Sequence, residues 1–217
     1  MQKRIGLLLS GCGQLDGSEI HETIVTMLAL DREGVEIVFM APDTKLNVIN
    51  HFEKKSVKEQ RNVMVEASRL SRGKMKDIKD IKISDIDAII LPGGAGAIKN
   101  LSDFADKGAN AVINPDVQRL ILEMNENNKT IGAICISPAV VAKILSPKKI
   151  QVTIGNDLAT KSVIESMGCQ HIDCTVDDIV VDQANKIVTT PAYMLGPGIK
   201  EIAVGIEKLV KKVVSMA

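Results

Sequence analysis

The chain has 217 residues, of which 45% are hydrophobic; it contains one Tyr, three Phe and no Trp, and 27 basic residues balance 27 acidic ones. The core must therefore be aliphatic, and aromatic surfaces on which a protein could stack bases are missing. Zero net charge provides no field that attracts nucleic acid or an anionic membrane, and no apolar stretch approaches the ~20 residues of a membrane span. We expect neither partner.

The beginning of the chain and its cysteines indicate the compartment. The apolar run Ile5–Leu9 is followed at once by Ser10-Gly11-Cys12-Gly13. It is too short for a signal peptide and is predicted to be the first strand. The four cysteines have neither the spacing of a disulfide framework nor a C-x-x-C pair. We expect a cytoplasmic protein with reduced thiols, no metal and no cofactor.

Short apolar segments alternate with amphipathic segments of helical length. Strands are predicted at Ile5–Leu9, Val35–Met40, Ala88–Leu91 and Ile131–Ile134, and a hairpin at Ile179–Val181 and Ile187–Thr189. Helices are predicted at Ser18–Arg32, Gln60–Ser71, Asp116–Asn125, Pro138–Leu145, Thr160–Met167 (with Thr160 as N-cap) and Gly198–Val214. Residues 43–60 and 72–86 are polar and weakly periodic, and are candidate insertions that cover a pocket.

This alternation of strands and helices predicts the architecture. We expect residues 1–217 to form a single α/β domain, a three-layer α/β/α sandwich with a mostly parallel, doubly wound, flavodoxin-like sheet. In such a fold, ligands bind beyond the carboxyl ends of the strands.

Cys135 lies where the predicted strand Ile131–Ile134 turns directly into the predicted helix Pro138–Leu145. So abrupt a turn exposes the side chain at the bend and needs small residues two positions to either side, which Ala133 and Ser137 supply. The following helix directs unpaired N–H groups and its positive dipole end at the sulfur. We expect a nucleophile elbow in which the pKa of Cys135 is lowered. The alternative is a buried structural cysteine.

A glycine-rich segment, Pro92-Gly93-Gly94-Ala95-Gly96-Ala97, follows the predicted strand Ala88–Leu91. Because it carries so few side chains, a substrate can approach its backbone N–H groups closely. The amide of Gly94 and the amide of Ile136, at the start of the elbow helix, are expected to bind an oxyanion. The segment has neither the G-x-x-x-x-G-K-[ST] pattern of a phosphate-binding loop nor a dinucleotide fingerprint.

Together these two features resemble the class I amidotransferase-like superfamily, and within it the PfpI and parkinsonism-associated deglycase branch. In that branch a strand ending in Leu-Pro-Gly-Gly precedes a strand ending in Ala-x-Cys. Longer motifs, distributed over nearly the whole chain, are similar to those of the ElbB family, whose members are called isoprenoid-biosynthesis proteins with an amidotransferase-like domain, or glyoxalases. They are Ser10-Gly11-Cys12-Gly13, Asp16–Glu22, Asn47–His51, Lys99–Ser102 and Thr189–Leu195.

The resemblance implies an acidic partner for the cysteine, because in the deglycase branch a glutamate of the first helix meets the elbow cysteine. Counting back twelve residues from Gly34, the expected helix stop, gives Glu22, and Glu19 is the rival one turn earlier. Beside a thiolate in a desolvated pocket, Glu22 is expected to hold a proton near neutral pH and to shuttle protons. An inward stripe of Val25, Leu28 and Ala29 on the same face argues against an ordinary surface residue.

The sequence departs from the family in its histidines. Many relatives carry a histidine on the strand after the elbow, but residues 152–157 contain none. His171-Ile172-Asp173 comes nearest to the His-x-Glu of a glutaminase, yet lies only 36 residues beyond Cys135 with no suitable helix after it. We therefore expect no triad and no glutaminase activity.

Other polar residues are candidates for contact with the substrate. His51 lies in a predicted covering segment, and loops of this kind often carry binding residues. Gly93, Asn100 and Cys12 are the other candidates for the substrate pocket. His21 is expected to point away from Glu22, toward solvent or another subunit.

The leading hypothesis is a cofactor-independent glyoxalase of low activity, acting on small dicarbonyl aldehydes. Cys135 would form a hemithioacetal, and glyoxal or methylglyoxal would become glycolate or lactate. One alternative is a cysteine-based redox sensor, with Cys12 as a resolving thiol. Another is a non-catalytic accessory protein linked to isoprenoid metabolism, which the family name suggests. The enzyme and sensor hypotheses separate in Glu22→Gln, because only an enzyme then loses dicarbonyl turnover.

The fold family commonly forms dimers, so we expect a homodimer. In the last predicted helix, Ile202, Ile206, Leu209 and Val213 form an apolar stripe. This stripe is expected to pack either on the core or on a partner.

Overall fold

Seven strands form a central sheet in the order β10-β11-β7-β6-β1-β2-β5 in the computed structural model, which describes residues 2–217. All neighbours are parallel except β10, which runs antiparallel to β11. The strands are β1 (Arg4–Leu8), β2 (Glu36–Ala41), β5 (Lys76–Asp77), β6 (Ala88–Leu91), β7 (Thr130–Ile134), β10 (Val180–Asp182) and β11 (Ile187–Thr190). Every residue of β6 and of β7 is buried, because both faces of the sheet are covered.

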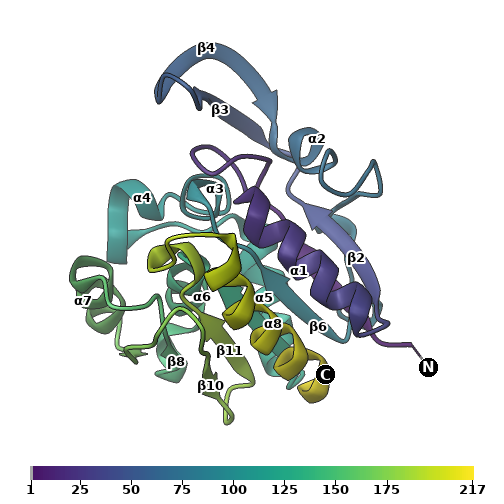
Figure 1. Ribbon diagram of the computed structural model, residues 1–217, viewed down its shortest axis with the longest axis vertical. Coiled ribbons are helices and arrows are strands. Elements are labelled where there is room, and N and C mark those ends of the chain that lie inside the picture. Colours follow the sequence, from purple (N-terminus) through teal and green to yellow (C-terminus); the bar gives the residue numbers. More distant parts are fainter. Residues whose placement is uncertain (1) are drawn as a thin grey trace.

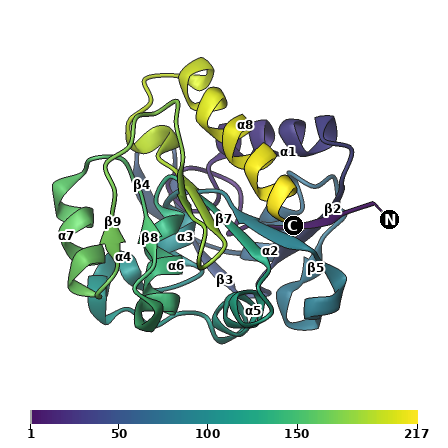
Figure 2. The same cartoon turned by 90° about the horizontal axis from the view of Figure 1, so that it is seen from below.

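Helices cover the two faces of this sheet (Figures 1 and 2). On one face lie α1 (Ile20–Arg32), α2 (Val63–Ala67) and α8 (Ile199–Met216), and on the other lie α5 (Pro115–Glu126) and α6 (Ser137–Leu145). Shorter helices are α3 (Ala95–Lys99), α4 (Phe104–Lys107) and α7 (Leu158–Ser166). The expected three-layer α/β/α sandwich with a mostly parallel sheet is confirmed. Within residues 2–217, no helix is both long and apolar enough to cross a bilayer.

The apolar stripe of α8 packs on the sheet. Ile202, Ile206, Leu209 and Val213 are fully buried in the core beneath α8, so this stripe is not available to a second subunit. On α1, in contrast, Leu28 is 46% exposed. The expected inward stripe through Leu28 is therefore wrong, and the outer face of α1 is apolar.

The helix predicted at Gln60–Ser71 is correct only over Val63–Ala67, because residues 60–62 belong to a strand and residues 68–71 form turns. Residues 45–62 form a hairpin of β3 (Lys45–Asn50) and β4 (Lys55–Asn62) that projects from the body of the molecule (Figure 1). Only then does α2 begin, with the Asn62 side chain accepting from the N–H of Val65 at 3.0 Å. Hydrogen bonds to the neighbouring strand β3 therefore outweigh the helical pattern of these residues.

Two smaller expectations also need correction. Helix α7 begins at Leu158, and its N-cap is Asp157, whose carboxylate accepts from the N–H of Thr160 at 2.8 Å. Thr160 is therefore inside the helix. Residues 72–86 contain β5 and two turns of 3₁₀-helix and form the edge of the sheet beyond β2, so this segment does not cover the elbow. A small parallel pair, β8 (Gln151–Val152) and β9 (Gln170–His171), completes the fold.

Candidate active site

Cys135 occupies a strained bend between β7 and α6. Its φ is +62°, in the left-handed region that residues other than glycine rarely adopt. The Cys135 N–H donates to the carbonyl of Thr190 at 2.9 Å, and the Ser137 hydroxyl donates to the carbonyl of Pro92 at 2.6 Å. The bend is thus tied to the last residue of β11 and to the residue that follows β6, as a rigid elbow requires.

Glu22, in the first turn of α1, is completely buried beside Cys135. One carboxyl oxygen accepts from the N–H of Gly93 at 2.9 Å, and the other accepts from the N–H of Tyr193 at 3.3 Å. The carboxyl also hydrogen-bonds to the Cys135 side chain. The structure therefore brings together a thiol and a carboxyl held in place by two backbone amides.

Gly93 lies between these two side chains, and any other residue there would separate them. A Cβ atom on Gly93 would lie 2.9 Å from the Cys135 sulfur and 2.8 Å from a carboxyl oxygen of Glu22, and would overlap the Cβ of Cys135. Gly94, at φ +94°, is equally constrained, since a Cβ there would overlap backbone atoms of Gly17 and Glu19. Both positions require glycine.

Burial controls the ionisation of the pair. Desolvation, helped by the nearby charge of Glu19, raises the pKa of Glu22 to about 7. Glu22 is therefore partly protonated at neutral pH. Desolvation also raises the pKa of the Cys135 thiol well above its ordinary value, and the charge of ionised Glu22 raises it further. The expectation that the elbow lowers the pKa of Cys135 is therefore wrong, because burial outweighs the helix N-terminus.

Two backbone amides oppose this rise in the pKa of Cys135. The N–H groups of Gly94 and Ile136 hydrogen-bond to the Cys135 sulfur and lower its pKa. They come from different strand–helix junctions, β6–α3 and β7–α6, and converge on one atom. A thiolate formed when Cys135 gives its proton to Glu22 therefore has two donors already in place.

Glu19, the alternative to Glu22 in the sequence analysis, has a different position from Glu22. Its carboxylate accepts from the N–H of Glu22 at 2.7 Å and caps the start of α1. The negative charge of Glu19 raises the pKa of Glu22. Glu19 therefore stabilises the helix and biases Glu22 toward its protonated form, while Glu22 contacts the cysteine.

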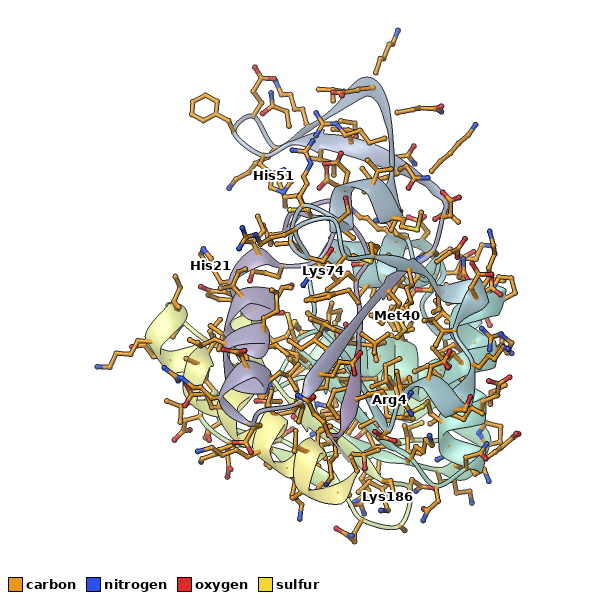
Figure 3. The ribbon with its side chains drawn as sticks, turned by 90° about the vertical axis from the view of Figure 1, so that its right-hand side faces the viewer. Arg4, His21, Met40, His51, Lys74 and Lys186 are labelled. Carbon is orange, nitrogen blue, oxygen red and sulfur yellow. The ribbon has the colours of Figure 1, made fainter. Side chains whose placement is uncertain are left out.

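His51 and Cys12 lie together elsewhere, on a cavity of about 300 Å³ between the β3–β4 hairpin and residues 11–17. Neither Cys135 nor Glu22 lines this cavity. His51 Nδ1 donates to the carbonyl of Ile49 at 3.0 Å, and Nε2 accepts from the N–H of Leu15 at 3.1 Å. Nε2 thus attaches the hairpin to the body, whereas the Nδ1 bond lies within the hairpin (Figure 3).

Asn100 also holds a loop in place. Its side-chain amide donates to the carbonyls of Ser10 and Asp16, at 2.7 and 2.8 Å. It lines a second cavity of about 250 Å³, on the other side of Asp16. Of the four residues predicted for the substrate pocket, only Gly93 lies at the thiol–carboxyl pair.

Sequence reasoning missed the role of Tyr193, although its motif was noted as a family feature. Its amide contacts Glu22, and its hydroxyl lies 2.8 Å from Nδ1 of His21. His21 is exposed, in line with the expectation that it points toward solvent, and it is connected to the site through Tyr193. His171 is buried and accepts from the N–H of Ile154 at 3.2 Å, a structural contact. Within residues 2–217, no three His, Cys, Asp or Glu side chains are grouped as metal ligands.

The family model described as DJ-1/PfpI family matches residues 14–194 of the chain. The matched range includes Glu22, Gly93, Cys135 and Tyr193. The chain belongs to the DJ-1/PfpI family. The match ends at the 3₁₀ turn that carries Tyr193, so it contains every residue that contacts Glu22 or Cys135 in the preceding paragraphs.

Several DJ-1/PfpI relatives resemble the chain along its whole length. It is 39% identical to the rat protein named "ES1 protein homolog, mitochondrial", over 98% of this chain and 84% of the rat protein. Identity is also 39% to human "Glutamine amidotransferase-like class 1 domain-containing protein 3, mitochondrial", over 98% and 83%.

Solved structures have the same fold as this chain. The crystal structure of an isoprenoid biosynthesis protein with amidotransferase-like domain from Ehrlichia chaffeensis has a TM-score of 0.93 and 37% identity, and the match covers 99% of both chains. Drosophila melanogaster DJ-1beta, at 18% identity and a TM-score of 0.56, shares the fold.

Proposed function

We propose that the protein is a cofactor-independent enzyme of the glyoxalase type that converts small dicarbonyl aldehydes into hydroxy acids. The observation that carries the proposal is the buried contact between Cys135 and Glu22, with Gly93 between them and two amides directed at the sulfur. A thiol that can give its proton to an adjacent carboxyl is suited to adding reversibly to an aldehyde.

The reaction begins when Cys135 transfers its proton to Glu22 and its sulfur adds to the aldehyde carbon. The carbonyl oxygen becomes an oxyanion held by the N–H groups of Gly94 and Ile136, and protonation gives a hemithioacetal. Glu22, again ionised, removes the hydrogen on that carbon to give an enediolate and returns it to the adjacent carbon, while the hydroxyl proton on the first carbon passes to the oxygen of the second. This internal redistribution of electrons leaves a thioester, so no external oxidant or reductant is needed.

Water then hydrolyses the thioester. It releases glycolate from glyoxal, or lactate from methylglyoxal, and restores the thiol of Cys135. The pKa of Glu22, about 7, suits both of its tasks, because an acid–base catalyst is most effective when its pKa lies near the working pH. Histidine is not required in this scheme.

The test is product analysis of purified protein incubated with methylglyoxal and glyoxal, followed by NMR. Wild type is expected to form lactate and glycolate, and Cys135→Ser to form neither above the rate in buffer. Cys169→Ser is the matched control, since Cys169 is a buried thiol on the far side of the sheet from α1. Equal product from wild type and Cys135→Ser would overturn the proposal.

A redox sensor is the second candidate. It is favoured by the same amides of Gly94 and Ile136, which would also bind the oxygens of an oxidised sulfur. Peroxide treatment should then place a sulfinate on Cys135, and dicarbonyl turnover should be absent from both wild type and Glu22→Gln. A non-catalytic role linked to isoprenoid metabolism has the name of the Ehrlichia chaffeensis relative as its support.

We also propose that the protein is a homodimer joined through the outer face of α1. Ile20, Ile24 and Leu28 are each more than 40% exposed there, and no charged residue lies between Glu22 and Asp31. Helix faces exposed to water are normally polar. In an antiparallel pair centred on Ile24, Ile20 would meet Leu28 of the partner subunit, so the stripe is complementary to itself.

Light scattering tests the dimer, with an expected mass twice the 23.4 kDa of one chain. Ile24→Asp should give the single-chain mass, and a single-chain mass for wild type would reject the dimer. For location, the cytoplasm stays our prediction, and cell fractionation checks it against the mitochondrial compartment in the names of the rat and human relatives.

A further inference from the structure

Tyr193, the only tyrosine of the chain, is attached to the first turn of α1 at two points. Its hydroxyl lies 2.8 Å from His21 Nδ1, and the two ring centroids are 5.8 Å apart. Its backbone N–H donates to a carboxyl oxygen of Glu22 at 3.3 Å. The side chain and the backbone amide of Tyr193 therefore bind two consecutive residues of α1, His21 and Glu22.

The segment that carries this amide also contacts the cysteine, and it is held in an unfavourable conformation. Thr190 accepts from the Cys135 N–H at 2.9 Å, and Ala192, immediately before Tyr193, has a φ of +43°. Alanine adopts positive φ only at an energetic cost, which surrounding contacts must offset. The bond between Tyr193 and His21 is one such contact, because it holds the end of this turn against α1.

We propose that His21 and Tyr193 are positioning residues: they form a clamp that holds the Tyr193 amide on Glu22 and thereby determines the pH range in which Glu22 gives up its proton. Neither side chain needs to touch the substrate. His21 is exposed at the start of α1 (Figure 3), where a single hydrogen bond adds little to folding. The inference deepens the proposed function, because it concerns regulation of the same pair.

The direction of the effect follows from the groups around the clamp. Tyr193 faces Glu19 and Glu22 from α1 and Glu201 from α8, and Glu22 faces Glu19 and Cys135. The Tyr193 amide lowers the pKa of Glu22, as do the Cys135 side chain and the Gly93 amide. If the clamp opens, Glu22 keeps its proton to a higher pH, and the pair transfers protons in a more alkaline range.

The test is a titration of the Glu22 carboxyl by ¹³C NMR, with Glu22→Gln used to assign its signal. Tyr193→Phe and His21→Ala are each expected to raise the midpoint by about 0.5 pH unit or more, a fraction of what a hydrogen bond to a charged group usually contributes. His21→Gln is the matched control, since its amide can still bond to the Tyr193 hydroxyl. It should keep the midpoint near that of wild type.

An unchanged midpoint in both Tyr193→Phe and His21→Ala would overturn the inference, whatever happens to thermal stability, because a purely structural contact changes stability alone. If Tyr193→Phe does not fold, His21→Ala suffices, since it alters only an exposed side chain. The titration needs no substrate. A shifted midpoint without dicarbonyl turnover would keep the clamp and reject the proposed function; turnover with unchanged midpoints would do the reverse.

Discussion

Cys12 and Cys135 both lie close to carboxylates, but they differ in burial and in hydrogen-bond donors. Cys12, beneath the β3–β4 hairpin, is half-buried, and its pKa is raised by burial and by the charges of Glu66 and Asp16. Cys135 is buried beside Glu22, and its pKa is raised for the same two reasons. Only Cys135 also accepts hydrogen bonds from two backbone amides. What distinguishes the candidate nucleophile is therefore its donors and a carboxyl able to take its proton, rather than a low pKa.

The largest expected effect concerns stability against pH. The pKa of Glu22 is about 7 in the folded protein, above its usual 4.5, so its stabilising contribution is complete below pH 4.5. That contribution is lost as pH rises through about 7. Relative to Glu22→Gln, which does not titrate, wild type should lose about 3 kcal/mol of unfolding free energy over this range. Urea unfolding at several pH values measures it; parallel curves would mean that Glu22 ionises normally.

Glu22→Gln should also remove catalysis while leaving adduct formation. The amide can still donate to sulfur, but it cannot shuttle a proton, so turnover should fall ~10²-fold or more. Steady-state lactate formation and mass spectrometry of the Cys135 adduct measure the two separately. Glu19→Gln is the control. Loss of turnover in Glu19→Gln alone would assign the proton transfer to Glu19.

Gly93→Ala tests the contact between thiol and carboxyl directly. The added methyl group overlaps Cys135 and Glu22, and such overpacking typically costs about 1–3 kcal/mol. We expect lower thermal stability and loss of turnover together. Gly198→Ala is the matched control, because its methyl group would meet only the end of the flexible Glu201 side chain. Full activity in Gly93→Ala would show that the pair need not be in contact.

The smallest expected effects are changes in the alkylation rates of the two thiols, Cys135 and Cys12. Glu22→Gln removes a charge that raises the pKa of Cys135, so iodoacetamide at pH 8 should alkylate Cys135 about tenfold faster than in wild type. Glu66→Gln should accelerate alkylation of Cys12 only about twofold to threefold, because Cys12 is half-buried and in part solvated. Peptide mapping reports both rates. Equal acceleration at the two sites would remove the distinction between them.

The fold and the elbow could be predicted from the sequence because their signals are local. A buried strand leading into a helix at Cys135 is visible in five or six residues, and so is the glycine-rich segment after β6. Counting back from Gly34 identified Glu22 as the partner of the cysteine, but the count was meaningful only because the family resemblance implied a glutamate in the first helix. The count already favoured Glu22 over Glu19, and the structure places Glu22 at the thiol and Glu19 at the helix cap.

Other features depend on contacts between distant residues and gave no local signal. The hairpin at 45–62 replaced part of a predicted helix because β4 pairs with β3. The pKa of Cys135 depends on burial from all sides, which the helix N-terminus alone does not reveal. His51 was expected at the substrate pocket because of its loop, yet both its nitrogens bind backbone atoms. Tyr193 acts through its amide, and a sequence does not show where an amide points.

That amide has a consequence for how the protein can evolve. Apart from Cys135, the groups that donate to the Glu22 carboxyl are the backbone N–H groups of Gly93 and Tyr193. Those that donate to the sulfur are the N–H groups of Gly94 and Ile136. A mutation changes a side chain but leaves the N–H in place, unless it introduces proline or moves the chain. Residues around the pair can therefore diversify while the four N–H donors to the carboxyl and the sulfur are retained.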